Sequence, residues 1–412
     1  MHILMLSDVY FPRINGVSTS IQTFATSYLN MGHEVTLIAP QYPQDNGNAI
    51  GNGLTVIRIR SRRLPFDPED RLMSLRAIKR LSPQLEDMGL DLVHIQTPFV
   101  AHYAGIWLAR RLGLKTLTTY HTFFEAYLEK YLPMVPGHWL RGLARMYSRH
   151  QCNDVDAIVS PSHQMLARLR EYGATTQAAV IPTGLPAACF DGSTVSDFRA
   201  AHGVADDAFL LLYVGRVAFE KNIGFLLDVF EQVADQVPNA VLLIAGEGPA
   251  LDSLEKRALR RGRQQRIRFI GYLDRAVELP TCYRASDLFV FASQTETQGL
   301  VLLEAMAAGL PVVSLASMGS LDVLRDGEGA VISPPDVTQF ARHVVALAYD
   351  STRLHDLGSR GRRYAATWTA DNKAREMLSF YDAVLTQQTG DDTPRPSAPA
   401  AKAGTRLQVE KD

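Results

Sequence analysis

The sequence predicts an α/β protein built from two consecutive doubly wound sheets of parallel strands. The chain has 412 residues, which is more than a single hydrophobic core usually accommodates. Short apolar segments alternate with amphipathic helical segments along most of the chain, as βαβ units require. The alternation starts again after Pro186, so each half of the chain is expected to form its own sheet.

The first series of strands begins at the N-terminus. The apolar run His2–Leu6 is followed by a turn and then by a helical pattern that ends at Gly32. The apolar face of that helix is formed by Ile21, Phe24, Ala25, Tyr28 and Leu29. Further strands are predicted in HEVTLIAP, LTVIRIR, DLVHIQT, LKTLTTY, DAIVSPS and AAVIPTG.

The second series of strands comprises FLLLYVGR, AVLLIAGEG, IRFIGYL, DLFVFAS and LPVVSLA, each bounded by Gly, Pro or Asp. We therefore place a first domain at 1–185 and a second domain at 186–370. A last amphipathic helix is predicted over 371–388. Residues 389–412 contain almost no large apolar residue before Leu407, and we expect this tail to be disordered.

Composition narrows the functional classes. The net charge of −1 argues against the broad basic face of a nucleic-acid-binding protein. Cys152, Cys189 and Cys282 show no C-x-x-C spacing, which argues against a zinc site or a disulfide framework and fits a reducing cytoplasm. The N-terminus lacks the basic residues of a signal peptide, and no apolar run reaches the ~18 residues of a membrane span. We expect a cytoplasmic protein that binds no nucleic acid.

The strongest functional signal is the segment SQTETQGLVLLEAMAAGLPVV. Glu296 follows a predicted strand, and Glu304 lies within an apolar helix that Gly299 and Leu300 open. A carboxylate in such a helix is costly unless it is paired or faces a cleft. The N-terminus of the helix can offer backbone N–H groups to a phosphate. Alternatively, Glu304 pairs with an arginine, or the two carboxylates form a glycosidase acid/base pair, which the mid-helix position disfavours.

Other candidate residues follow predicted strands, at the edge where such sheets bind ligands. Arg216 ends FLLLYVGR and Lys221 comes five residues later, so two fixed cations are available for a diphosphate. Gly246 lies in the turn AGEGP, Gly16 follows the first strand, and His121 follows LKTLTTY. Taken singly, these residues are also explained as surface cations, turn glycines and a structural histidine. The absence of a G-x-G-x-x-G motif gives little support to an NAD site.

A D-x-D pattern at Asp154-Val155-Asp156 is typical of metal-dependent glycosyltransferases. Here it precedes the strand AIVSP, at the end of the sheet opposite the candidate site. We interpret it as a strand-start loop and expect neither a metal nor another cofactor.

These segments together resemble family 4 of the retaining glycosyltransferases, which have the GT-B fold of two Rossmann-like domains facing across a cleft. The resemblance extends to about residue 388, and its most specific motifs are Glu-x7-Glu with the following Gly-Leu-Pro and, less so, G-R-x4-K. It implies that the first domain binds the acceptor, that the second binds a nucleotide sugar, and that the last helix crosses back onto the first domain.

The resemblance also implies residue roles. Glu296 would contact the transferred sugar, Glu304 the ribose diol, and Arg216 and Lys221 the diphosphate. The implied catalytic residues are His121, Glu296, Arg216 and Lys221. The implied donor-binding residues are Gly16, Arg216, Lys221, Gly246, Glu296, Gly299, Leu300 and Glu304. The segment IPTGLP departs from the usual Ile-Pro-x-Gly-x-Asp, so the role of the acid expected after Gly184 is in doubt.

The segments DVYFPRINGVSTSI and TYHTFFEAYL look most like bacterial transferases that glycosylate diacylglycerol or phosphatidylinositol-type lipids. The resemblance therefore implies hexose transfer from a UDP-glucose- or GDP-mannose-type donor to a lipid, and it favours UDP-glucose. Arg141, Arg145 and Arg149 form one stripe of a predicted amphipathic helix, which suits peripheral docking on the inner, anionic face of the cytoplasmic membrane. The alternative for this helix is that it packs only on its own sheet. The alternatives for the function are transfer to a soluble or polysaccharide acceptor, a nucleotide-sugar epimerase of this fold and a non-catalytic sugar-nucleotide binding module.

Overall fold

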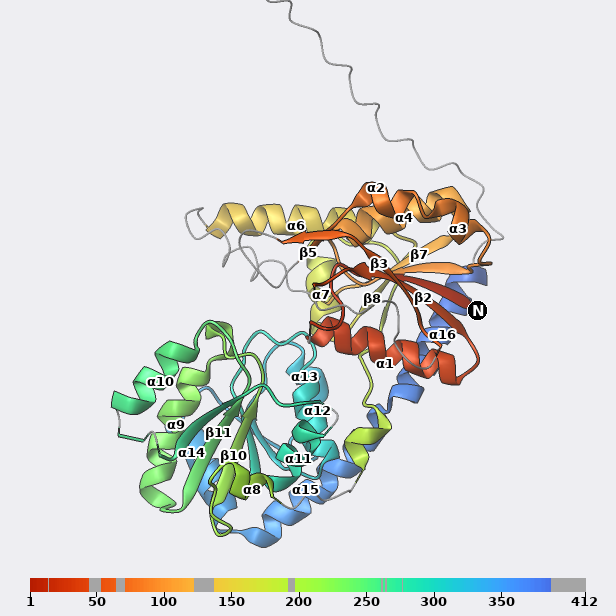
Figure 1. Cartoon of the computed structure of the whole chain (residues 1–412). Helices are drawn as coiled ribbons and strands as arrows, with labels where there is room; N and C mark the ends of the chain where they lie inside the picture. Colours follow the sequence, from red (N-terminus) through yellow and green to blue (C-terminus); the bar gives the residue numbers. More distant parts are fainter. Residues whose placement is uncertain are drawn as a thin grey trace, which may run out of the picture.

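The computed structural model describes residues 1–13, 15–43, 53–63, 71–121, 137–191, 197–260, 262–263, 265–275 and 277–386. It consists of two α/β units, one above the other in Figure 1, each built around a parallel sheet. The predicted α/β class with two doubly wound sheets is confirmed. The expected disordered tail at 389–412 lies outside the described residues.

The first sheet contains seven parallel strands in the order β3-β2-β1-β6-β7-β8-β9. Its central strands β1, β6 and β7 are almost wholly buried because helices cover both faces of the sheet. The strand order reverses between β1 and β6, which creates a crevice at their carboxyl ends. The strands are β1 (His2–Leu6), β2 (Glu34–Pro40), β3 (Thr55–Ile59), β6 (Leu92–Ile95), β7 (Lys115–Thr119), β8 (Ala157–Ser160) and β9 (Ala178–Val180).

The helices of the first unit connect these strands. They are α1 (Gly16–Asn30), α2 (Leu75–Lys79), α3 (Ser82–Glu86), α4 (Val100–Leu112), α6 (Gly137–Asn153) and α7 (His163–Glu171). A two-stranded antiparallel ribbon, β4 (Ser61–Arg63) and β5 (Arg71–Met73), was not expected from the sequence. In Figure 1, α6 extends from the first unit beyond the edge of its sheet.

The second sheet contains six parallel strands in the order β12-β11-β10-β13-β14-β15, and its order reverses between β10 and β13. Five of the strands match predicted segments. The sixth, β15, is a four-residue run without a helical or alternating pattern to identify it. The strands are β10 (Phe209–Val214), β11 (Ala240–Ala245), β12 (Ile267–Gly271), β13 (Leu288–Phe291), β14 (Val312–Leu315) and β15 (Ala330–Ser333).

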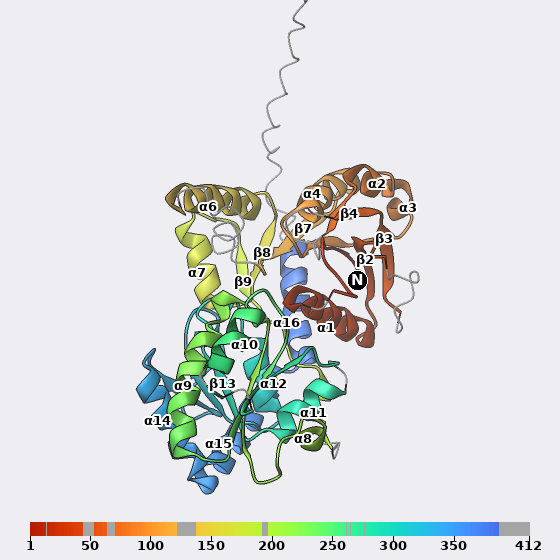
Figure 2. The same cartoon turned by 60° about the vertical axis from the view of Figure 1, so that its left-hand side comes forward.

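The helices of the second unit pack on both faces of this sheet, as the two views in Figures 1 and 2 show. They are α8 (Phe198–Ala201), α9 (Ile223–Gln236), α10 (Leu251–Arg260), α11 (Glu278–Ala285), α12 (Leu300–Ala307), α13 (Ser320–Val323), α14 (Val337–Ala348) and α15 (Ser351–Ala365). The described part of the chain also contains the 3₁₀ turns η1 (Ala187–Phe190), η2 (Phe219–Lys221) and η3 (Ala366–Trp368).

The last helix, α16 (Ala370–Thr386), follows the second unit in sequence but packs against α1 of the first. Tyr381 lies within the core of the first unit, where its hydroxyl is 3.2 Å from the Tyr28 hydroxyl and 2.6 Å from Nδ1 of His94. The chain therefore passes between the units twice. The two crossings pair side by side, because Leu185 N donates to Trp368 O (2.7 Å) and Ala370 N donates to Leu185 O (2.8 Å).

Candidate active site

A cleft with a volume of about 500 Å³ lies between the carboxyl ends of the two sheets. All nine residues predicted for the site line it: Gly16, His121, Arg216, Lys221, Gly246, Glu296, Gly299, Leu300 and Glu304. They converge because the carboxyl ends of parallel strands meet at one edge of each sheet, and these two edges face each other. The structure thus brings the predicted residues together, while their individual roles stay predictions.

Two cations follow β10. Lys221 is the last residue of η2, and its Nζ donates to Oε1 of Glu296, the carboxylate that follows β13. Both side chains are largely buried, at 20% and 14% exposed. Arg216 is exposed at the cleft wall, and among the described residues no acid lies within ion-pair distance of its guanidinium. The ion pair fixes Lys221 and Glu296, whereas Arg216 presents its charge to the cleft.

Gly246 has a structural explanation in addition to its place in the cleft. Its φ is 137°, and a Cβ at this position would overlap the carbonyl oxygen of Gly215. The ends of β10 and β11 can therefore approach each other only with a glycine here. The close approach leaves both strand ends at the floor of the cleft.

Gly16 differs from Gly246. It is the first residue of α1, and Asn15 caps the helix by accepting a hydrogen bond from Ser18 N (2.8 Å). A Cβ on Gly16 would meet no atom within 4 Å, so no protein contact requires a glycine at this position. A side chain here would instead reduce the space at the cleft wall, which is consistent with close approach of a ligand.

Glu304 is buried in α12, at 6% exposed. Its Oε1 accepts from Nη2 of Arg275 (2.5 Å) and its Oε2 accepts from the hydroxyl of Tyr283 (2.9 Å). Burial, followed by the negative charge of Glu304, raises the pKa of Tyr283 well above its usual value, and Glu304 raises the pKa of Arg275. The arginine pairing considered as an alternative for this residue is therefore present, yet Glu304 and Arg275 both also line the cleft.

The start of α12 completes this wall of the cleft. Gly299 precedes the helix with φ 86°, a left-handed conformation that favours glycine, and the helix begins at Leu300. Gly299, Leu300 and Val301 all line the cleft, so the first turn of the helix borders it. An α-helix carries partial positive charge at this end, which suits a phosphate.

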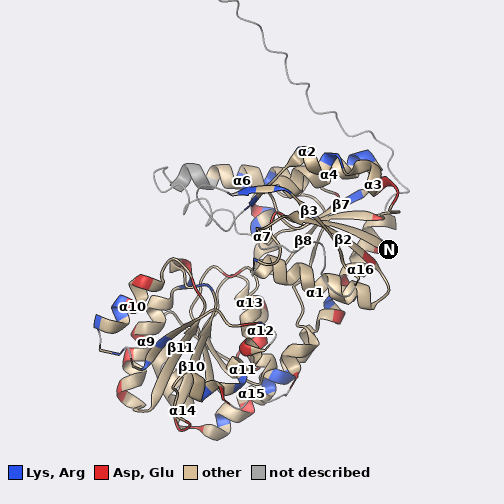
Figure 3. Ribbon diagram, viewed as in Figure 1, with Lys and Arg blue, Asp and Glu red and all other residues tan. Residues whose placement is uncertain are grey.

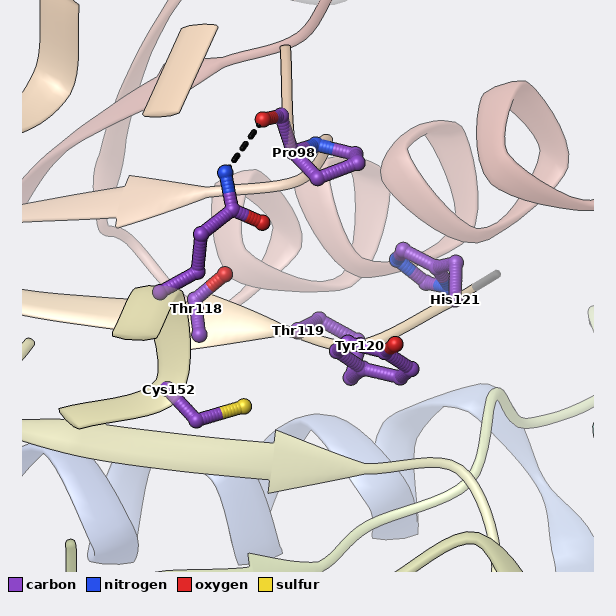
Figure 4. Close-up of a pocket in the computed structure, with 7 residues that line it drawn as sticks. Pro98, Thr118, Thr119, Tyr120, His121 and Cys152 are labelled. Carbon is purple, nitrogen blue, oxygen red and sulfur yellow. Dashed lines mark hydrogen bonds between the residues drawn. The ribbon is translucent and has the colours of Figure 1, made fainter. Parts of the chain in front are cut away.

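His121 lies at the end of β7, on the opposite wall. Its Nε2 is 3.0 Å from Oε1 of Gln96, an acceptor, so Nε2 carries the proton and Nδ1 is the unprotonated nitrogen. Burial lowers the pKa of His121 to about 4, so the ring is neutral at pH 7. Figure 4 shows His121 after Thr119 and Tyr120, beside a small cavity that Pro98 and Cys152 also border.

Two protein families match the chain. "Glycosyltransferase Family 4" matches residues 14–188, and "Glycosyl transferases group 1" matches residues 195–364. The alpha-monoglucosyldiacylglycerol synthase of Streptococcus pneumoniae (strain ATCC BAA-255 / R6) is 32% identical over 321 residues, which cover 76% of this chain and 71% of the relative. The chain belongs to glycosyltransferase family 4.

This family 4 glycosyltransferase is also similar to a second curated relative and to a solved structure. The alpha-monoglucosyldiacylglycerol synthase of Acholeplasma laidlawii is 28% identical over 321 residues, covering 76% of this chain and 80% of that protein. Among solved structures, the sucrose-phosphate synthase of Thermosynechococcus elongatus superimposes with a TM-score of 0.76 at 21% identity, covering 94% of this chain and all of the other. The predicted GT-B fold is confirmed.

The D-x-D pattern of this glycosyltransferase is used structurally. Asp156 accepts hydrogen bonds from Thr116 N (2.9 Å) and Thr116 Oγ1 (2.8 Å) and pairs with Lys115 (3.3 Å), all at the amino end of β7. Asp154 pairs with Arg110 at the end of α4 (3.2 Å). Both carboxylates therefore lie at the edge of the sheet away from the cleft, as the sequence predicts.

The departure at IPTGLP lies in the first crossing between the units. Pro186 stands where the family usually has an acid, directly before η1. Gly184 is required by packing, because its Cβ would lie 2.6 Å from Cα of Ala370 in the second crossing. Neither residue lines the cleft, although Thr183 does.

Sequence reasoning missed the partners that hold the predicted side chains. Gln96 orients His121, while Arg275 and Tyr283 contact Glu304. These residues lie in other segments of the chain and carry no motif of their own. The position of Gln96 at the carboxyl end of β6, next to the reversal of strand order, is the one signal that could have indicated it.

Proposed function

We propose that this glycosyltransferase transfers a hexose, glucose from UDP-glucose, to a hydroxyl group of a lipid such as diacylglycerol and retains the anomeric configuration. The observation that carries the proposal is the convergence of Arg216, Lys221 and the first turn of α12 on one cleft, opposite Gly16 and His121. The names of the two synthases reported above support glucose as the sugar and diacylglycerol as the acceptor.

The wall of the cleft that carries Arg216 and Lys221 suits the departure of a nucleoside diphosphate. As the sugar–phosphate bond breaks, negative charge grows on the β-phosphate. Lys221 and the N-terminus of α12 are fixed groups that would stabilise this charge without reorganising, and the exposed guanidinium of Arg216 would add a second cation. Glu304 would accept hydrogen bonds from the ribose hydroxyls, and Glu296 from hydroxyls of the sugar. This arrangement needs no metal ion to neutralise the leaving group.

The anomeric configuration is retained if the acceptor hydroxyl attacks the anomeric carbon from the same face of the sugar from which the phosphate leaves. A phosphate oxygen then takes the proton of the acceptor as the new glycosidic bond forms. His121 is neutral at pH 7 because burial lowers its pKa to about 4. Its unprotonated Nδ1 can therefore accept a hydrogen bond from a hydroxyl of the sugar, whereas a role as proton donor is unsuited to this state.

Helix α6 supports a lipid acceptor. Leu143 and Met146 are 52% and 64% exposed on its surface, and Arg145 and Arg149 are exposed beside them. Figure 3 shows basic segments along the described part of α6. Arg141, which also belongs to the predicted stripe, has its side chain outside the described residues. Exposed apolar and basic side chains on one helix suit peripheral docking on an anionic bilayer.

The anchoring of α6 fits the same proposal. Tyr147 and Gln151 donate hydrogen bonds to Pro98 O, at 2.8 Å and 2.5 Å, so the second half of the helix is fixed at the carboxyl end of β6. Gln96, which holds His121, lies two residues earlier. A bilayer under α6 would thus lie close to the acceptor side of the cleft. No helix among the described residues has the length and apolar character to cross a membrane.

The test supplies labelled UDP-glucose or GDP-mannose together with diacylglycerol in vesicles, a bacterial lipid extract, or a soluble oligosaccharide. We expect labelled glycolipid from UDP-glucose and diacylglycerol, and we expect an α-glucosidase but not a β-glucosidase to release the sugar. Label in the oligosaccharide alone would overturn the lipid acceptor. Product from GDP-mannose alone would overturn the donor, and a β-linked product would overturn retention. Membership of a transferase family disfavours the epimerase alternative, and interconversion of the nucleotide sugar without any transfer would revive it.

A further inference from the structure

The loop between β13 and α12 is joined to the first crossing between the units by the side chain of Gln298. Gln298 lies in this loop, two residues after Glu296 and directly before Gly299. Its Oε1 accepts from Thr183 N (2.8 Å), and its Nε2 donates to Thr183 O (2.7 Å). Gln298 and Thr183 are both buried, at 6% and 4% exposed. The side-chain amide therefore pairs with both backbone polar groups of one residue in the first crossing.

Thr183 is in turn hydrogen-bonded to the first unit. Its Oγ1 donates to Oγ of Ser20 on α1 (2.8 Å), and Ser20 is only 1% exposed. The same helix begins with Gly16 at the opposite wall of the cleft. A continuous set of buried hydrogen bonds thus runs from the loop that carries Glu296 to the helix that faces it.

A second contact supports the same loop from behind. Gly319 N donates to Glu296 O (2.8 Å), and the segment that contains Gly319 leads into α13. Asp322 on α13 accepts from the backbone N–H of His163, at the start of α7 in the first unit. The backbone of Glu296 is therefore held between two contacts that both end on the first unit.

The first crossing, to which Gln298 is hydrogen-bonded at Thr183, is tightly packed. Gly184 follows Thr183, and its Cα lies so close to Ala370 that a Cβ would approach within 2.6 Å. Leu185 pairs with both Trp368 and Ala370. A rigid pair of crossings transmits the position of one unit to the other, and Gln298 is attached directly to it.

We propose that Gln298 is a positioning residue, which sets Glu296 and the start of α12 in register with the acceptor side of the cleft. A carboxamide is suited to this task because it donates and accepts in one plane, whereas a carboxylate only accepts. The proposal rests on the proposed function, since it assigns the donor to one wall and the acceptor to the other. It predicts that Gln298 affects the encounter of the two substrates more than the binding of the donor.

The experiment compares transfer of the sugar with hydrolysis of the donor by water. Hydrolysis needs the donor wall alone, whereas transfer needs both walls in register. Gln298→Met keeps the length of the side chain and removes both hydrogen bonds. We expect transfer to fall by on the order of 10²-fold, the cost of misplacing reacting groups by about 1 Å. Hydrolysis and the donor KM should stay near the parental values.

Matched variants separate positioning from a general loss of structure. Gln294→Met makes the same chemical change four residues earlier, at an exposed position, and should leave both rates unchanged. Thr183→Val keeps the backbone groups that Gln298 grips but removes the hydroxyl bonded to Ser20, so it should lower transfer in the same direction by a smaller factor. An equal fall of transfer and hydrolysis in Gln298→Met, or a change confined to the donor KM, would overturn the proposal.

A measurement that needs no turnover tests the role of Gln298 independently of the acceptor. Hydrogen exchange is measured at the amides of Leu185 and Ala370, which join the crossings and do not line the cleft. UDP should slow their exchange in the parent protein but not in Gln298→Met, and equal slowing in both would contradict the coupling. If the parent protein transfers sugar to no lipid, the proposed lipid acceptor is wrong. The effect of UDP on hydrogen exchange still tests the role of Gln298 in that case.

Discussion

The two walls of the cleft differ in the number of ionic groups that they carry. The wall from the second unit carries most of the ionic groups that line the cleft among the described residues: Arg216, Glu220, Lys221, Arg275, Glu296 and Glu304. The wall from the first unit contributes backbone, hydroxyl and amide groups, one arginine (Arg13) and the neutral His121. The difference indicates a division of work, in which one wall holds a charged donor and the other admits an acceptor without formal charge at its reacting hydroxyl.

The charged wall is itself organised in two ways. Lys221–Glu296 and Arg275–Glu304 are ion pairs between largely buried groups, which fixes both carboxylates before any ligand arrives. Arg216 is exposed and has no such partner among the described residues. Fixed dipoles and charges stabilise a transition state without paying for reorganisation. Variants of the paired and unpaired cations should therefore behave differently.

The largest expected effect concerns these cations. Arg216→Ala and Lys221→Ala should each lower kcat by about 10²-fold or more, because each removes a charge that stabilises the leaving diphosphate. Lys221→Ala should also lower thermal stability, since it leaves the carboxylate of Glu296 without its partner. Steady-state kinetics and calorimetric unfolding measure the two effects.

A lysine remote from the cleft provides the control. Lys256 is exposed on α10, and Lys256→Ala should retain parental turnover and stability. Parental turnover in both Arg216→Ala and Lys221→Ala would refute their assignment to the diphosphate. A stability loss in Arg216→Ala equal to that in Lys221→Ala would refute the distinction between the two cations.

The next effect concerns Glu304. Glu304→Gln should weaken donor binding by roughly 10- to 100-fold, because charge-assisted hydrogen bonds to the ribose hydroxyls are worth about 1.5–3 kcal/mol each. Arg275→Met is the matched variant, since it removes the ion pair and keeps the carboxylate. Titration calorimetry with UDP-glucose should show a smaller loss in Arg275→Met than in Glu304→Gln. Equal losses would mean that Glu304 serves only to hold Arg275.

The residues on the charged wall show what could be predicted from sequence. The buried strands are continuous apolar runs, so their order along the chain and the place of their carboxyl ends could be inferred. Arg216, Gly246 and Glu296 were found because they follow such strands. Arg275 and Tyr283 were not, since their contacts with Glu304 arise only when α11, α12 and the loop after β12 pack together. The partners of a site depend on tertiary packing, which local patterns do not encode.

The first unit contains a further contrast, in α6. Its C-terminal half is tied to Pro98, while Leu143 and Met146 are exposed. Replacing Arg141, Arg145 and Arg149 by Glu should weaken sedimentation with anionic vesicles, since each basic residue near such a surface contributes about 1 kcal/mol. The effect is limited for Arg145, whose guanidinium lies over the ring of Tyr172, 5.6 Å from its centroid.

The control for α6 changes the same number of charges elsewhere. Arg353, Arg360 and Arg363 are exposed on α15 of the second unit, and their triple change to Glu should leave sedimentation unchanged. Binding by the parent protein should also weaken with salt, because the Debye length falls from about 10 Å at 0.1 M to about 3 Å at 1 M. If the parent ignores anionic vesicles, or if both triple variants bind equally well, α6 is a structural element and a soluble acceptor gains support.

A smaller effect is expected from protonation of His121. Because burial lowers its pKa to about 4, the ring should remain neutral from pH 8 down to pH 5 and gain its proton only as the pH approaches about 4. The pH profile of kcat/KM between 5 and 8 should therefore contain no step that disappears in His121→Gln. A step near pH 6.5 that this substitution removes would show that the ring titrates normally and would favour a proton-transfer role.

The smallest expected effect is that of a chelator. Among the described residues, no group of three or more His, Cys, Asp or Glu side chains is placed to hold a metal ion, and the carboxylates of Glu296 and Glu304 are paired with Lys221 and Arg275. A divalent cation bound by Glu296 or Glu304 would have to displace an ion pair, whereas Arg216 and the start of α12 are available to a diphosphate directly. EDTA should therefore leave turnover at its parental rate. Loss of activity in EDTA that Mg²⁺ or Mn²⁺ restores would show that the charged wall is incomplete without a metal ion, and the roles of Arg216 and Lys221 would then be shared with it.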